Sequence, residues 1–422
     1  MLEFSIFKSS RTILIVALLA VGLINTDVHA DTIKKASITK ETPEPYRFVV
    51  RGTNIVDKKT NKPLFFNGIG YSPYLPNETP LHGDGPGNDN RYSAHLPLMR
   101  AMGANYLHVF PINMPGNFFK EMDTTDFVYG QDMFVWAYEK DFLADEFQQK
   151  TLNDLRKVID HTYQIGRPDR LVVFSVGDEL QSESVILTDR KHPEVNAYSV
   201  KHINVSNRTP TEVALAKLID GAMDYELSTY GKRHLYCHTS WTHIGPIGDR
   251  KDLEVPYENV LSADMGDIIC MNIYTYARGV RSSAPGSVTK TSYQGYLEDL
   301  AKQSNKPIFI TQVGFSTSPF EPKPWVPGFG GHKIEDIPNK LAHIWKDLRT
   351  AKGKEKYCGI CFFELNDEWW KSGDYPEDKT KHEQEDPEEW FGIYEVAPDS
   401  SLKPKGRIPD AIKALFSEKP SR

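Results

Sequence analysis

Two adjacent carboxylates, Asp178 and Glu179, follow the apolar run RLVVFSVG at residues 170–177. A continuous apolar run of this kind is typical of a parallel strand that is buried on both faces. Neighbouring side chains point in different directions, so the two carboxyl groups are expected to meet different environments. One of them could then stay protonated and act as an acid while the other stays charged. The pair therefore predicts acid chemistry at the end of a strand, against the simpler interpretation of a surface turn.

A second candidate is Gln312, which stands with Thr311 near the end of the apolar run KPIFITQVGF, just before Gly314. A buried strand delivers side chains to an active site in this way. A carboxylate at position 312 would indicate a catalytic nucleophile, but an amide carries no charge and cannot take that role at a useful rate. Gln312 therefore indicates a site that is built to present a nucleophile and presents an amide instead.

The elements that position these residues are short apolar runs, which alternate with amphipathic or helix-sized segments from about residue 47 to 418. This pattern predicts an α/β fold, a (β/α)8 TIM barrel in a single domain. A doubly wound open sheet is the structural alternative, but no glycine-rich phosphate fingerprint follows the first expected strand. The expected strands are 64–68 (after a hairpin that turns at Asn61-Lys62), 105–113, 132–140, 170–180, 234–241, 266–276, 306–315 and 357–370. The expected helices are 95–103, 147–166, 213–231, 293–305, 337–351 and 408–416.

In such a barrel the active site lies at the C-terminal ends of the strands. The side chains expected there are rich in carboxylates and aromatics, which suit the hydroxyls and the C–H faces of sugars. Glycosidic cleavage needs an acid and a second group that stabilises or traps the cation-like carbon. In strand order the set is Tyr71, Tyr74, His108, Asn113, Tyr138, Glu139, Asp178, Glu179, His238, Trp241, Asn272, Tyr274, Tyr276, Gln312, Glu364, Asp367, Glu368 and Trp369.

Several of these residues also have a plain structural interpretation. A tyrosine at a strand end belongs to the core or the rim more often than it contacts a ligand, and Glu139 and Glu368 fit a solvated or structural role better than a catalytic one. His108 and His238 could bind a metal together with a carboxylate, but no HxH or HExxH spacing supports this. We therefore expect neither a metal nor a cofactor.

The composition agrees with a sugar-binding protein without proving one. The chain has 422 residues and a net charge of −7, which gives no support for a nucleic-acid partner. Its 20 Tyr, 21 Phe and 7 Trp residues suit an uncharged, ring-shaped ligand. The sequence makes no prediction of the oligomeric state.

The N-terminal segment has the pattern of an export signal. Lys8 and Arg11 precede the apolar run Thr12–Ile24, and Val28-His29-Ala30 places small residues at the cleavage-determining positions. This predicts a signal peptide at residues 1–30, a polar leader at 31–46 and a secreted or periplasmic protein without a stable membrane span. An uncleaved anchor is the alternative, although the run is short for one.

The four cysteines, Cys237, Cys270, Cys358 and Cys361, lie in apolar, strand-like runs. Cys358 and Cys361 are three residues apart on an expected strand, so their side chains point to opposite faces rather than toward one metal. We expect buried thiols that behave as small hydrophobes. One disulfide among the four remains open in an oxidising compartment.

Six short segments, taken in order, carry a family resemblance: NGIGYSPY, GANYLHVFPIN, FSVGDEL, DIICMNIYTY, KPIFITQVGF and FFELNDEWW. Over roughly residues 47–395 the chain resembles the (β/α)8 retaining glycoside hydrolases whose catalytic carboxylates lie on strands four and seven. That group includes endo-β-glucanases, β-mannanases and β-1,3-glucanosyltransferases. Each segment is weak alone, and the specificity lies in their order and spacing.

The resemblance implies a role for several residues. Glu179 matches the acid/base after strand four, and Asp178 stands where the family usually has an Asn that binds the sugar 2-hydroxyl. Tyr274 matches the strand-six aromatic that contacts the nucleophile. Trp369 or Trp370 lies near the strand-eight sugar platform.

The departures from the family pattern gather at one place. Gln312 falls on the nucleophile, and His108 falls where an Arg often supports that carboxylate. An Arg at position 108 would have no ion pair with the uncharged Gln312, so a His that can be neutral fits this replacement. Together with Asp178, the three departures look like one rearrangement. The expected substrate-binding residues are His108, His238, Trp241, Tyr274, Glu364 and Trp369.

Two classes of function follow. In the first, the protein is a glycosidase or transglycosylase acting on a β-linked oligo- or polysaccharide, with Glu179 as the acid. The second catalytic role would pass to Glu364, to Asp367 or to water activated by Asp178. By analogy with hexosaminidases that carry an Asp-Glu pair after strand four, the acetamido group of the substrate could also take that role. In the second class, the protein is a glycosidase-like barrel that binds carbohydrate without turnover.

Overall fold

The computed structural model describes residues 44–418 except 82, 136–137, 249–253, 277–283, 321–329 and 372–378. The predicted signal peptide and most of the predicted leader lie outside the described residues. Of the leader, Glu44–Pro45 form β1, which pairs in parallel with β11 (Lys232–Arg233). Within the described residues we find no helix with the length and apolar character needed to span a membrane.

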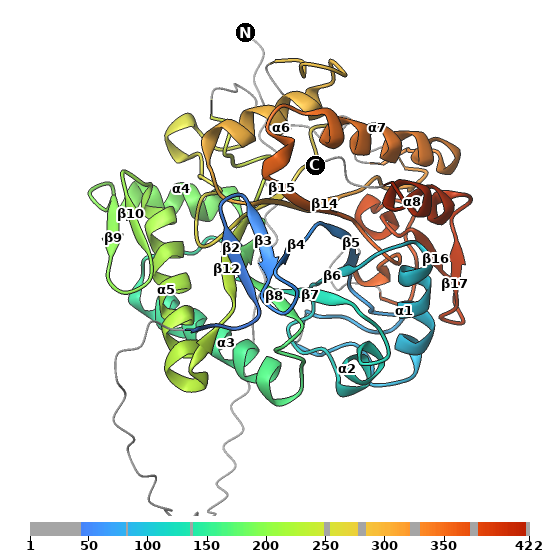
Figure 1. The fold of residues 1–422 in the computed structure, drawn as a ribbon, viewed down its shortest axis with the longest axis horizontal. Coiled ribbons are helices and arrows are strands. Elements are labelled where there is room, and N and C mark those ends of the chain that lie inside the picture. Colours follow the sequence, from blue (N-terminus) through green and yellow to red (C-terminus); the bar gives the residue numbers. More distant parts are fainter. Residues whose placement is uncertain are drawn as a thin grey trace, which may run out of the picture. The chain divides into compact units, whose positions relative to one another are not determined.

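Eight parallel strands close into a barrel in which strand order follows the chain (Figure 1). Each strand pairs with the next one along the chain, and the last pairs with the first. The predicted (β/α)8 TIM barrel is therefore confirmed. Its strands are β5 (Phe66–Tyr71), β6 (Tyr106–Val109), β7 (Val128–Met133), β8 (Leu171–Asp178), β12 (Leu235–Trp241), β13 (Ile269–Asn272), β14 (Ile308–Val313) and β15 (Tyr357–Phe362).

Helices surround this barrel, as the ribbon in Figure 1 shows. The longest, α5, begins at a capping box between Thr209 and Glu212 and ends at Gly231, whose φ of 74° is left-handed. Between β12 and β13 the described residues form no α-helix but a short 3-10 turn, η1 (Tyr257–Asn259). The helices are α1 (Arg91–Ala101), α2 (Gly116–Met122), α3 (Asp145–Gln164), α4 (Ser182–Lys191), α5 (Pro210–Tyr230), α6 (Ser292–Gln303), α7 (Ile337–Thr350) and α8 (Ile408–Phe416).

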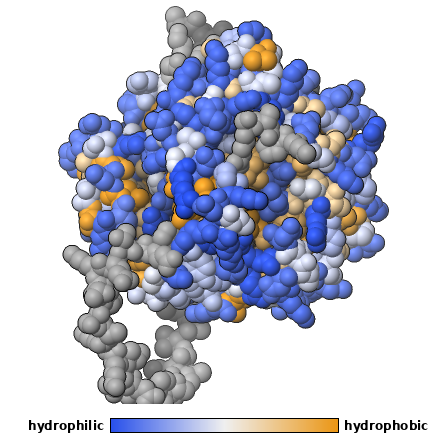
Figure 2. Space-filling view, in the orientation of Figure 1, coloured by the Kyte–Doolittle hydropathy of each residue, from blue (hydrophilic) through white to orange (hydrophobic). Residues whose placement is uncertain are grey.

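A small antiparallel sheet closes the N-terminal end of the barrel. It contains β2 (Phe48–Arg51), β3 (Asn54–Asp57) and β4 (Lys62–Pro63). The hairpin is present as predicted, but its turn covers residues 58–61 and Lys62 belongs to β4. Phe48 and Ile55 pack in one cluster with barrel residues such as Phe309. The face that carries this sheet is largely hydrophilic in Figure 2. The other short strands pair as β9 (Ala197–Ser199) with β10 (Asn204–Ser206), and β16 (Tyr394–Val396) with β17 (Leu402–Pro404).

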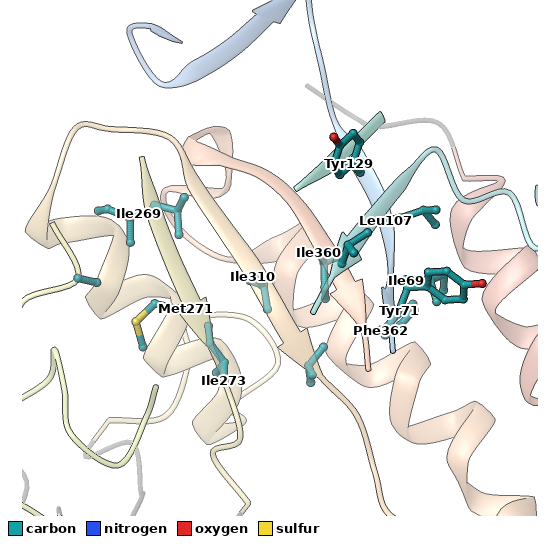
Figure 3. Packing of buried hydrophobic residues seen from close by; sticks show 14 of the residues in the cluster. Ile69, Tyr71, Leu107, Tyr129, Ile269, Met271, Ile273, Ile310, Ile360 and Phe362 are labelled. Atoms are coloured by element: carbon teal, nitrogen blue, oxygen red, sulfur yellow. The ribbon is translucent and has the colours of Figure 1, made fainter. Parts of the chain in front are cut away.

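Alternation along each barrel strand decides which side chains reach the barrel interior. One set, including Ile69, Leu107 and Met271, packs outward against the helices (Figure 3). The alternate set, including Tyr106 and Cys237, fills the interior. All four cysteines are buried and free.

The prediction for the third strand, residues 132–140, is wrong. The strand is β7, which ends at Met133, so Tyr138 and Glu139 lie in the turn beyond it. Tyr138 is 55% exposed, and Glu139 has a left-handed φ of 49°. The first strand also extends further than predicted, to Tyr71. These shifts change which residues stand at the mouth of the barrel.

Candidate active site

A cleft of about 330 Å³ opens at the C-terminal end of the barrel, and both Glu179 and Gln312 line it. Its wall combines carboxylates with aromatic rings, and Lys371 contributes a cation. Of the predicted site residues, the cleft also brings together Trp241 and Tyr274. The described residues that line it are Glu179, Gln181, Ser182, Glu183, Trp241, His243, Glu254, Tyr274, Gln312, Phe363, Lys371, Glu388 and Phe391.

The backbone after β8 separates the two adjacent carboxylates. Gly177 has a φ of 74° and Glu179 a φ of 50°, both in the left-handed region that favours glycine. Asp178 between them is 5% exposed and stays in the barrel, whereas the Glu179 side chain borders the cleft. The expectation of two different environments for the pair therefore has a local backbone cause.

Asn272, at the end of β13, holds the two carboxyl groups together. Its Nδ2 donates to Asp178 Oδ1 at 2.7 Å and to Glu179 Oε1 at 2.8 Å. The Thr311 hydroxyl donates to Asn272 Oδ1 at 2.7 Å, which fixes the orientation of the amide. One amide group thus bridges the acid that borders the cleft and the carboxyl beneath it.

Gln312 is 8% exposed, and both ends of its amide are occupied. Its Nε2 donates to Asp178 Oδ2 at 3.0 Å, and its Oε1 accepts from the Tyr274 hydroxyl at 3.1 Å. A carboxylate at position 312 could not make the first of these bonds to an ionised Asp178. The amide therefore fits its neighbours, and Asp178 receives amide donors on both oxygens.

Asp132, at the end of β7, is a third buried carboxyl that the sequence analysis missed. Its neighbours Tyr129 and Met133 pack outward, so alternation directs Asp132 into the barrel. It is 1% exposed, and its Oδ1 has no hydrogen-bond partner among the described residues. Asp132 could have been predicted from its position at the end of β7. The predicted strand 132–140 instead begins at Asp132, which places this residue at the opposite end of the strand.

Burial holds protons in this site. It raises the pKa of Glu179 to about 7; the hydrogen bond from Asn272 opposes the shift, and the negative charge of Glu388 reinforces it. Burial also raises the pKa of Asp132 and of Asp178 well above the usual range, and the charge of Glu179 adds to both shifts. A carboxylic acid that still carries its proton near neutral pH can protonate a leaving group.

Two strand-eight carboxylates, predicted as alternative catalytic groups, are not among the described residues that line the cleft. Glu364 is 1% exposed, and burial beside Glu368 raises its pKa well above the usual range. Asp367 is fully buried and forms an ion pair with Lys405 at 2.6 Å. The Lys371 ammonium contacts Glu368 at 2.9 Å and lies 5.0 Å from the Phe363 ring.

Trp369 is 8% exposed and belongs to an aromatic stack rather than to the cleft wall as described. Its ring lies 5.6 Å from His382, which stacks in turn on Trp390 at 3.6 Å. The neighbouring Trp370 meets Tyr74 edge to face at 6.1 Å. The aromatic rings at the cleft are Trp241, His243, Tyr274, Phe363 and Phe391.

The two predicted histidines are fully buried, and neither is part of the described cleft wall. Burial lowers the pKa of His108 to about 3 and that of His238 to about 4, so both are neutral at ordinary pH. His108 faces inward beside the Tyr106 hydroxyl at 3.3 Å. His238 follows the inward-facing Cys237, so its side chain points outward from the barrel. Its Nδ1 is hydrogen-bonded to the Val176 carbonyl oxygen at 3.0 Å. Within the described residues, no group of three or more His, Cys, Asp or Glu side chains could hold a metal ion.

Comparison with known proteins shows a likeness of fold and not of sequence. No protein-family model matches the chain, and no curated protein matches it. A GH2 β-galacturonidase from Eisenbergiella tayi bound to galacturonate is 14% identical, with a TM-score of 0.53 over 88% of this chain and 53% of that chain. A β-glucuronidase from Ruminococcus gnavus in complex with C6-substituted uronic isofagomine is 12% identical, with a TM-score of 0.54 over 88% of this chain and 52% of that chain.

Saccharomyces cerevisiae Gas2p, a mutant in complex with laminaritetraose and laminaripentaose, is 12% identical, with a TM-score of 0.52 over 89% of this chain and 68% of that chain. Identities this low establish likeness of fold alone. The chain spans about half the length of the two bacterial enzymes.

Proposed function

We propose that the protein is a glycosidase or transglycosylase that acts on a β-linked oligo- or polysaccharide, with Glu179 as the general acid. The N-terminal pattern at residues 1–30 supports a site of action outside the cytoplasm. The observation that carries the proposal is the placement of Glu179, which borders the cleft at the end of β8 and whose pKa burial raises to about 7. The solved structures of similar fold include a β-galacturonidase, a β-glucuronidase and a protein in complex with laminaritetraose and laminaripentaose, which agrees with this class.

The second catalytic group is a carboxylate of the cleft rim rather than one from strand eight. Gln312 lacks a charge, Glu364 is buried, and Asp367 is neutralised by Lys405. Glu254 and Glu388 border the cleft, are exposed, and act electrostatically on Glu179. Either could activate a water molecule on the opposite side of the sugar from the acid, as inverting glycosidases require.

A carbohydrate-binding protein without turnover is the second candidate, and one observation favours it. The Gln312 amide is hydrogen-bonded at both ends, by Asp178 and Tyr274, as expected for a position that does not react. The cleft and its aromatic wall would serve a binder equally well. The retained acid Glu179 favours the enzyme.

The test is turnover by wild type and by Glu179→Gln on β-glucans, mannans, acetamido-sugar oligomers and uronides, with oligosaccharide binding measured by calorimetry. We expect Glu179→Gln to lower the rate by about 10²–10⁴ and to leave binding largely intact, because it removes the proton donor alone. Glu146→Gln, an exposed change in the first turn of α3, is the matched control. Undiminished turnover in Glu179→Gln would place the acid elsewhere. Binding without turnover in wild type would favour the second candidate.

A further inference from the structure

Among the described residues that line the cleft, negative side chains outnumber positive ones. Four of its described lining residues are glutamates, namely Glu179, Glu183, Glu254 and Glu388. The cation among those lining residues, Lys371, is already paired with Glu368 at 2.9 Å. The charge of Lys371 also acts on Glu179 and Glu388, so among the described lining residues one cation faces four glutamates.

Beneath the cleft, the buried carboxyls also lack a counter-charge. Asp178 is held by the amides of Asn272 and Gln312, which are neutral donors. Asp132 is 1% exposed and leaves Oδ1 without a partner among the described residues. Elsewhere in the described chain a buried carboxylate can have its cation, as Asp367 has Lys405 at 2.6 Å. Because burial keeps protons on Asp132 and Asp178, these two carboxyls add no negative charge, and the charge of the cleft comes from the glutamates that line it.

This distribution discriminates between classes of sugar. A uronic acid would bring another negative charge into a partly desolvated cleft, where like charges repel more strongly than in water. A neutral sugar would leave the deficit unchanged. A protonated amine would supply the missing positive charge, and its C–H faces could still pack on Trp241 and Tyr274.

We propose that the cleft binds a saccharide that carries a protonated amino group, and that Glu254 and Glu388 are the residues that select for it. The inference rests on the proposed function, because it takes the cleft to be a saccharide site. The solved structures of similar fold include complexes with galacturonate and a uronic isofagomine. The charge of this cleft is opposite to what such ligands need.

The experiment measures binding of four oligomers of equal length: β-linked glucosamine with free amines, its N-acetylated form, the corresponding glucan and a uronate oligomer. Calorimetry is run at mildly acidic pH, where the amines are charged, at low and at physiological ionic strength. We expect the amine oligomer to bind about tenfold more tightly than the glucan. Added salt should reduce this advantage, because it screens exposed charges.

Glu254→Gln and Glu388→Gln should each weaken binding of the amine oligomer about threefold and leave glucan binding unchanged. Binding is the readout because both residues are also proposed to serve the reaction. Glu355→Gln, an exposed change in η3 (Lys354–Lys356) near the other end of the barrel, is the matched control. Equal affinity for amine oligomer and glucan, or a preference for the N-acetylated or uronate form, would overturn the inference and leave the proposed function standing. Failure of all four oligomers to bind would remove both.

Discussion

Buried carboxylates lie at opposite ends of the barrel, and they are built in opposite ways. At the N-terminal end, Glu226 is fully buried and accepts two hydrogen bonds on each oxygen. Oε1 accepts from His234 Nδ1 at 2.5 Å and Tyr163 OH at 2.8 Å, and Oε2 accepts from the His234 backbone at 3.0 Å and Tyr236 OH at 2.9 Å. At the C-terminal mouth, Asp132 is equally buried but leaves Oδ1 without a partner in the described residues.

The protonation of the two ends differs accordingly. Burial alone would raise the pKa of Glu226, but the charge of His234 and the surrounding donors lower it instead. At the mouth burial prevails, and the pKa values of Asp132, Asp178 and Glu179 all rise. The Glu226 carboxylate has a full set of partners and stabilises the fold, whereas Asp132 keeps one oxygen without a partner among the described residues. Polar groups left unsatisfied in an otherwise consistent fold are a mark of function.

The largest expected effect that tests this contrast is on stability at the N-terminal end. Glu226→Gln should lower the free energy of unfolding by about 3–5 kcal/mol, because the new NH₂ group would face donors and the buried His234 would lose its partner. Denaturant unfolding at neutral pH measures the loss. The specific activity of the folded fraction of Glu226→Gln should match that of wild type.

Glu146→Gln again serves as the exposed control and should change stability little. A loss below about 1 kcal/mol would mean that Glu226 is no better supported than a surface residue. If Glu226→Gln lost most of its activity at unchanged stability, Glu226 would have to take part in the reaction, and the active site could not be at the C-terminal end alone.

The next effect concerns the mouth. Gln312→Glu would set a carboxylate against Asp178, to which the amide now donates at 3.0 Å. The substitution removes the hydrogen bond that the amide donates and sets an ionisable group beside buried carboxyls, which should lower turnover about ten- to hundredfold. Initial rates on the best substrate measure this, and Gln149→Glu on the exposed face of α3 adds the same charge elsewhere.

The opposite result would change the interpretation of the mouth. A rise in turnover with a glycosyl ester trapped on position 312 would identify a decayed retaining glycosidase whose nucleophile had been restored. An ester on Glu364 in wild type would contradict the placement of the site at Gln312. Slower cleavage of acetamido sugars alone would favour the substrate-assisted route through Asp178.

Much of the barrel could be predicted because buried parallel strands appear as continuous apolar runs. β8, β12, β14 and β15 were found in this way, and so was α8 from its 3.6-residue spacing. The position of β7 is hard to predict because its inward residues are Gly130 and Asp132, while the described residues of the more apolar stretch after it form no strand. α2 and α4 are short, and their pattern is weak.

The site was predictable where it depends on strand ends and not where it depends on loops or register. Glu179 and Gln312 were placed correctly at the mouth because each ends an apolar run. The bridging role of Asn272 was not predictable, since it depends on the irregular register between β13 and β14. Glu254 comes from a loop and Glu388 from the short 3-10 turn Pro387–Trp390, and neither segment has a periodic pattern. Trp369 does stand beyond β15, but His382 from a distant loop covers it.

The smallest expected effect is on the pH dependence of stability. It compares the C-terminal mouth of the barrel with its N-terminal end most directly. Because the pKa of Asp132 is raised in the folded state, the native protein holds a proton that the unfolded chain releases above the ordinary aspartate pKa. The folded state therefore binds more protons, and the free energy of unfolding falls as pH rises through this window. Asp132→Asn removes the titrating group. The free energy of unfolding of the variant, relative to that of wild type, should therefore rise by about 1 kcal/mol between about pH 4 and about pH 8, which is roughly 2 °C in Tm. Thermal unfolding across that range measures the difference, with Asp126→Asn, exposed just before the other end of β7, as the control. A gap between Asp132→Asn and wild type that stays constant with pH would mean that Asp132 is ionised in the folded protein, and the contrast between the two ends would then rest on geometry alone.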